Sequence, residues 1–250
     1  GGALSRLKEL AKHDHLREHC LRAMADRSTQ FEGISPTPFL DGLADQNPRV
    51  QAAALIGLNR ILSDGIRKGS AVADGQKKQS VLDLRDSIAK AVLPLTMRTQ
   101  EKPEAKGDAW RQPDPGRVIP HLAIKTLVGI QGDKACVEGL NGPYRTGALA
   151  ALRELHLSST VDALFRVLST SADAELRMQV WTTLIRLYHK EGEYKGGWWG
   201  TRPDTTGPYY DRKPWKESDR IGAAVKVALT EGDKQLAEHI QAELKRHVVK

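Results

Sequence analysis

One apolar pattern recurs along the chain and restricts what it can fold into. Apolar or small side chains fall at positions i, i+4 and i+8 in five segments, usually with a further large residue beside the middle one. This spacing puts the three side chains on one face of an α-helix, so each segment predicts an amphipathic helix with a buried stripe. The stripes are Leu16, Cys20 and Met24; Val50, Ala54 and Leu58; Ile119, Ala123 and Leu127; Tyr144, Ala148 and Leu152; and Leu176, Val180 and Leu184.

The stripes are spaced like the units of a helical repeat. Their first positions lie 34, 69, 25 and 32 residues apart, so the second gap is about twice the others and predicts an insertion. A helix pair cannot bury its apolar face alone, but stacked pairs can. We therefore predict an all-α fold, an α–α superhelix (solenoid) with irregular insertions. The first helix of each pair is predicted from shorter apolar segments at 38–43, 88–95, 135–140 and 161–168.

Two turns between paired helices repeat the same chemistry, at 45–50 and 171–177. A polar cap residue is followed by Pro or by an acid in the first turn, which is typical of a helix start. The string Asp45-Gln46-Asn47-Pro48-Arg49-Val50, with Ala53, Ala54 and Leu58 after it, resembles the start of the second helix in HEAT repeats. The resemblance implies an armadillo-like scaffold that takes part in protein–protein interactions.

The repeat pattern also predicts how the chain is organised. HEAT-like repeats are expected over 1–190, with insertions at about 63–80 and 99–116. An aromatic, Gly- and Pro-rich insertion is expected over 191–216, and a C-terminal helix pair over 217–250 would complete the solenoid. The insertion at 63–80 is rich in Gly, Ser, Lys and Gln and has no aromatic residue, which favours a flexible linker.

The 191–216 segment, hereafter the aromatic insertion, has a different composition. Three of the five tryptophans and three of the five tyrosines fall between Tyr194 and Trp215. Two interpretations remain open: a small core of its own against the repeats, or a ligand surface with aromatic faces for a sugar ring or a partner side chain. The middle insertion holds a faintly similar string with Trp, Arg and Pro-Asp. The candidate ligand-binding residues are Trp198, Trp199, Arg202, Asp204, Tyr209, Tyr210 and Trp110.

Residues 198–210 read W-W-G-T-R-P-D-T-T-G-P-Y-Y, and residues 117–123 read R-V-I-P-H-L-A. Together they resemble the HEAT region of very large planctomycete and verrucomicrobial proteins, which are known as membrane-bound dehydrogenases. Those chains carry a propeller-like domain before the repeats and a cytochrome c domain after them. This sequence has no C-x-x-C-H motif, so the resemblance assigns no electron-transfer role to any residue. It implies a fragment of an exported multidomain protein, periplasmic or extracellular.

The search for catalytic or metal-binding patterns nominates no site. His15 and His19 would share a helix face next to His13, Asp14 and Glu18, but no third ligand is fixed, so a solvated polar face is favoured. No nucleophile elbow, phosphate-binding loop or dinucleotide fingerprint occurs, and we predict no cofactor. Two structural thiols are expected at Cys20 and Cys136.

The net charge of +7 raises the question of nucleic acid as a partner. Lysines and arginines are interleaved with acids, so the sequence favours protein domains of the same or another chain, or a carbohydrate, over nucleic acid. No apolar run approaches the roughly 20 residues that span a bilayer. The alternative function is a basic HEAT-like enzyme that resembles the alkylpurine DNA glycosylases, at the level of fold and charge only.

Overall fold

Helices account for nearly all of the regular structure. The computed structural model describes residues 2–27, 34–67, 75–97, 114–193, 210–231 and 234–249. Over these residues the only strands are two of two residues each, so the predicted all-α class is confirmed. The elements are α1 (Gly2–Leu10), α2 (Asp14–Met24), α3 (Thr37–Leu43), α4 (Pro48–Arg67), α5 (Gly75–Val92), η2 (Leu93–Thr96), α6 (Pro115–Gly129), α7 (Asp133–Glu138), η4 (Gly139–Asn141), α8 (Arg145–Leu152), α9 (Ser158–Thr170), α10 (Ala174–Leu187), β1 (His189–Lys190), β2 (Lys213–Pro214), α11 (Ser218–Glu231) and α12 (Lys234–His247).

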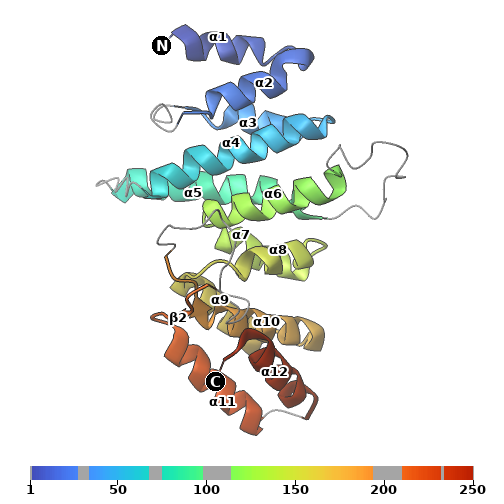
Figure 1. Cartoon of the computed structure of the whole chain (residues 1–250), viewed down its shortest axis with the longest axis vertical. Helices are drawn as coiled ribbons and strands as arrows, with labels where there is room; N and C mark the ends of the chain where they lie inside the picture. The colour runs from blue at the N-terminus through green and yellow to red at the C-terminus, as the bar shows by residue number, and fades with distance from the viewer. Residues whose placement is uncertain are drawn as a thin grey trace. The chain divides into compact units, whose positions relative to one another are not determined.

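The chain divides into two compact units, Gly1–Ala151 and Leu152–Lys250, and each has a buried core of its own. In the first unit α4 is the central helix: it packs against α2 and α3 on one side and α6 on the other (Figure 1). The stripe Val50, Ala54 and Leu58 is buried on α4. The Thr126 hydroxyl of α6 donates to the Leu55 carbonyl of α4 at 3.0 Å, which ties the two helices together.

Small residues let the helices of the first unit approach closely. Gly57 of α4 lies against the ring of the fully buried Phe39 of α3, and a Cβ at position 57 would come within 2.2 Å of that ring. Ala123 of α6 is likewise fully buried. The close packing of α3, α4 and α6 therefore depends on glycine and alanine at the contact positions.

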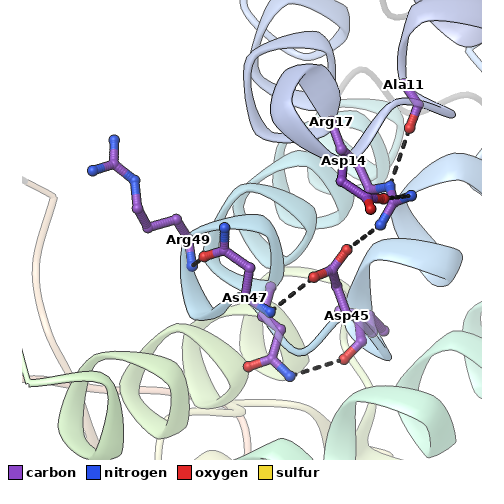
Figure 2. A network of polar contacts seen from close by, with 8 residues as sticks. Ala11, Asp14, Arg17, Asp45, Asn47 and Arg49 are labelled. Atoms are coloured by element: carbon purple, nitrogen blue, oxygen red, sulfur yellow. Dashed lines mark hydrogen bonds and ion pairs between the residues drawn. The ribbon is translucent and has the colours of Figure 1, made fainter.

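The start of α4 is fixed by the turn that the sequence singled out. Asp45 accepts from the backbone N–H of Asn47 at 2.8 Å, and the Asn47 side chain accepts from the N–H of Arg49 at 3.0 Å (Figure 2). These bonds satisfy N–H groups that have no partner inside the helix. The predicted helix start at this turn is confirmed, since α4 begins at Pro48.

The same turn is joined to α2 by charge. Arg17 of α2 donates to Asp45, to Asp14 at 2.8 Å and to the Ala11 carbonyl at 3.1 Å (Figure 2). Arg49 donates through its Nε to the buried Glu18 of α2 at 2.7 Å. The backbone bond from Asn47 and the bonds from Arg17 lower the pKa of Asp45, so this carboxylate stays charged.

In the second unit α10 is the central helix and packs against α9, α11 and α12. Its stripe Leu176, Val180 and Leu184 is buried, as are Ile221 of α11 and Ile240 of α12. Asp173 caps α10 by accepting from the Leu176 N–H at 2.9 Å, which confirms the second predicted helix start.

Several predicted details differ from the structure. Leu16, predicted to lie on the buried stripe, is 40% exposed in the first turn of α2. Tyr144 precedes α8 instead of lying in it. Part of the linker predicted at 63–80 is helical, since residues 63–67 belong to α4 and 75–80 to α5. The end of the insertion predicted at 99–116 is helical as well, because α6 begins at Pro115.

Among the described helices, none has the length and apolar character needed to cross a membrane.

Candidate functional site: the base of the aromatic insertion

The two ends of the aromatic insertion meet in a short antiparallel ribbon. His189 of β1 pairs with Pro214 of β2, and Lys190 pairs with Lys213. Beyond the ribbon, the Gly192 N–H donates to the carbonyls of Tyr210 and Asp211 at 3.1 and 3.0 Å. The two described ends of the insertion therefore lie side by side in the second unit. We call this place the base; it comprises residues 189–193 and 210–215 with His156 and Ser218, which hold them.

The close approach in the base requires a glycine. A Cβ at Gly192 would lie 2.8 Å from the Asp211 carbonyl oxygen, nearer than a side chain tolerates. Asp211 itself has a φ of 41°, a left-handed conformation that Asp adopts more readily than most residues. The two positions together turn the chain tightly enough for the ribbon to close.

Trp215 fastens the base to the end of α10. Its indole N–H donates to the Leu187 carbonyl at 2.6 Å, and its ring lies edge-on to His156 at 5.3 Å between centroids. The buried Ser218 hydroxyl donates to the Tyr188 carbonyl at 2.6 Å and accepts from the Trp215 N–H at 2.8 Å. The last carbonyls of a helix have no partner within it, and here residues about 30 positions further along supply the donors.

Two histidines occupy the centre of the base. The Nε2 of His156 lies 2.9 Å from the His189 carbonyl, and the His189 ring lies edge-on to Tyr188 at 4.8 Å. Burial lowers the pKa of His156 despite its bond to that carbonyl. Burial also lowers the pKa of His189, and the positive charges of Arg212 and Arg186 lower it further. Both imidazoles are therefore neutral at pH 7.

The base carries equal numbers of basic and acidic side chains: Lys190, Arg212 and Lys213, and Glu191, Glu193 and Asp211. The pKa values of the two histidines are lowered in part by the positive charges of Arg186, Lys190 and Arg212. Lys190 lies opposite Lys213 in the ribbon. Lys213 forms an ion pair with Asp211 at 3.0 Å.

Within the base, the described hydroxyl and imidazole groups do not pair with each other as nucleophile and general base. The Ser218 hydroxyl is directed to the Tyr188 carbonyl, and His156 is directed to the His189 carbonyl. Cys136, in the first unit, is fully buried, and burial raises the pKa of its thiol to about 12. The geometry of the base serves to hold a loop, because Ser218 and His156 are both bonded to backbone carbonyls.

Of the predicted ligand-binding residues, the structure describes Tyr210. It lies half-buried in the base, where its N–H donates to the Glu191 side chain at 3.4 Å and its carbonyl accepts from Gly192. Tyr210 is thus part of the frame that closes the insertion. The other six candidates lie outside the described residues: Trp110, Trp198, Trp199, Arg202, Asp204 and Tyr209.

Sequence reasoning did not select Trp215, His156 or Ser218. Trp215 was visible as one of the clustered aromatics, but its role depends on the Leu187 carbonyl, which no local pattern reveals. The histidines of the base are 33 residues apart in sequence, with no motif joining them.

The histidine group considered for metal binding lies on the surface of α2. His15 and His19 are exposed, while Glu18 is buried and bonded to Arg49 and Arg22. Within the described residues no three His, Cys, Asp or Glu side chains are grouped so that they could hold a metal ion.

Comparison with known proteins identifies no related site. No protein-family model matches the chain, and no curated protein matches it. Among solved structures the chain is similar to the crystal structure of an engineered protein, with 15% sequence identity over 99% of this chain and 97% of that one. The TM-score of that comparison is 0.37, which does not indicate a shared fold.

Proposed function

We propose that this chain is a non-catalytic helical scaffold of the HEAT type that binds a partner protein domain through its aromatic insertion. The observation that carries the proposal is the base: Trp215, Ser218, His156 and the β1–β2 ribbon hold both ends of the insertion on the second unit. Binding residues are commonly carried on loops that a rigid scaffold positions.

The composition of the insertion supports a binding role over a plain linker. Trp and Tyr offer large apolar faces with polar tips, and such residues dominate protein interfaces. The HEAT assignment and the setting in an exported multidomain protein belong to the same proposal. They rest on the helix pairs and on the motifs at 45–58, 117–123 and 198–210.

The paired charges of the described residues weigh against the DNA glycosylase alternative. Glu18 binds Arg22 and Arg49, Asp86 binds Lys90 and Lys134, and Arg220 binds Asp162 and Glu217. Cations engaged in this way are not free to converge on a phosphate backbone.

The test is a Trp199→Ala variant, screened with the wild type by biolayer interferometry against a panel of extracellular protein domains and a glycan array. If the insertion is a binding surface, the substitution abolishes binding and leaves the melting temperature nearly unchanged. Phe165→Leu is the matched control, since it alters a half-buried aromatic on α9 that is not a candidate ligand-binding residue, and it should keep binding.

Two outcomes would reject the proposal. If the insertion is a structural core, Trp199→Ala lowers the free energy of unfolding by roughly 3 to 5 kcal/mol, as truncation of a large core residue does. If the wild type binds glycans and no protein domain, the insertion is a carbohydrate surface instead.

A further inference from the structure

An apolar groove with a volume of about 520 Å³ lies within the second unit, between α10, α11 and α12. Apolar side chains from all three helices line it: Ile185, Ile221, Val225, Leu229, Leu244 and Val249. On the same α11, Val227 is 51% exposed. Ile185, Ile221 and Val225 form the buried floor, while Leu229, Leu244 and Val249 are half-buried and keep apolar surface open to water.

The rim of the groove carries one acid and one base on α11. Asp219 and Lys226 both line it and both are exposed. They are seven residues apart, which is about two helical turns, so they lie on the same face about 10 Å apart. No ion pair joins either of them to another described residue, so both charges are available to a partner.

The midpoint between these two charges is occupied by the smallest residues of the face. Gly222 and Ala223 both line the groove there. Gly222 lies against the Tyr188 ring, where a Cβ would come within 3.2 Å, and Ala223 is exposed. The Tyr188 ring covers Gly222, so a second helix could approach the α11 backbone most closely at Ala223.

A face of this kind is complementary to itself. Consider a two-fold axis perpendicular to α11 that passes midway between residues 222 and 223. A rotation by 180° about it places Asp219 of one copy beside Lys226 of the other copy. Contacts across a two-fold axis are reciprocal, so a residue that meets another across it is met in the same way by the partner copy. An unrelated helix would need an acid and a base at the matching spacing, whereas a second copy has both by symmetry.

We propose that the α11 groove is the docking surface for a second copy of this chain. The two α11 helices cross antiparallel at the exposed Ala223, and Asp219 of each copy lies beside Lys226 of the partner subunit. The apolar groove is covered in the process, which supplies the driving force, while the two ion pairs set the orientation.

The first test is sedimentation velocity of the full chain over a range of concentrations. The wild type should show a monomer–dimer equilibrium with a dissociation constant of about 10 µM or below. Asp219→Lys and Lys226→Asp should each raise that constant at least about tenfold, because each substitution places like charges at both symmetric contacts.

The decisive test mixes the two variants. The Asp219→Lys chain carries two bases on the face and the Lys226→Asp chain carries two acids, so neither should pair with itself. Mixed in equal amounts, they should form a heterodimer with both ion pairs restored in reverse. Lys234→Asp, which makes the same charge change on the exposed start of α12, should dimerise like the wild type.

Ala223→Arg gives an independent check, because it blocks the centre of the face with a residue that favours helix and sits at an exposed position. It should be monomeric with unchanged helix content by circular dichroism. A wild type that stays monomeric at about 100 µM overturns the proposal. So does a dimer that all three variants keep, or a mixture of the two charge variants that does not pair. A monomer whose groove takes up an apolar dye would assign the groove to a small ligand instead, and this too overturns the proposal.

Discussion

At the scale of single residues, the base of the aromatic insertion is held by side chains that complete the end of a helix. The carbonyls of Leu187 and Tyr188 end α10, and Trp215 and Ser218 supply their donors. A buried carbonyl left without a donor costs about 1 to 3 kcal/mol, so these bonds matter more than an exposed bond would. The insertion and the helix end therefore stabilise each other.

Trp215→Phe should weaken this attachment, because phenylalanine has no N–H for the Leu187 carbonyl. We expect the free energy of unfolding to fall by about 1 to 3 kcal/mol. The Gly192 amide, whose bonds close the base, should exchange with solvent faster by NMR. Trp181→Phe is the control: the Trp181 indole N–H has no described partner, so Gly192 exchange should not change. Equal exchange in both variants would contradict the role assigned to Trp215.

The two histidines of the base make stability depend on pH. Burial lowers the pKa of His156, and burial with Arg212 and Arg186 lowers that of His189. Below about pH 6.5 the unfolded chain takes up protons that the folded chain does not, so stability is present above this pH and is lost as the pH falls towards the lowered values. For each histidine the slope cannot exceed about 1.4 kcal/mol per pH unit.

This pH dependence is measured as the melting temperature at pH 7.5 and at pH 5.5. His156→Gln keeps a donor for the His189 carbonyl and does not titrate, so the difference between the two temperatures should become smaller. His121→Gln alters an exposed histidine on α6 and should leave the difference as in the wild type. A His156→Gln variant as pH-sensitive as the wild type would show that His156 does not contribute.

At the scale of the helices, close packing in the first unit depends on positions without bulk. Glycine inside a helix is normally unfavourable by about 1 kcal/mol relative to alanine. At Gly57 the ring of Phe39 occupies the space where a methyl group would lie. The packing of α3 on α4 therefore outweighs the helix propensity at this position.

Gly57→Ala should lower the free energy of unfolding by about 1 to 3 kcal/mol, the typical effect of overpacking. Gly129→Ala is the control, because its methyl group would meet only the end of the Asn59 side chain, which is half-buried and can rotate. Adding Phe39→Leu to Gly57→Ala should recover part of the loss in a double-mutant cycle by urea denaturation. A stabilising Gly57→Ala would show that Phe39 moves aside freely.

At the scale of the whole molecule, the net charge is +7, but many of the cations lie beside acidic side chains and form ion pairs with them. A surface of this kind attracts polyanions weakly and without a preferred site. We expect a fluorescein-labelled DNA duplex to bind more weakly than about 10 µM at physiological salt by fluorescence anisotropy. A sub-micromolar complex with a steep salt dependence, or release of a modified base, would favour the glycosylase alternative.

The sequence by itself determined the helices and their inward faces. The i, i+4, i+8 spacing identified the buried sides of α4, α6 and α10, and the turns at 45–50 and 171–177 marked where two helices begin, because both signals are local and set by helix geometry. The composition of 63–80 was a weaker guide. Part of that segment is helical, since α4 and α5 extend into it.

Only the tertiary structure decided which distant residues meet. The base joins His156, Leu187 and Trp215, and the groove joins α10 to α11 and α12, with no shared motif among them. The division of the chain after Ala151 is equally invisible in the repeat pattern. Local periodicity states which face of a helix is buried, but which helix covers that face depends on packing between segments far apart in the chain, and no spacing in the sequence encodes it.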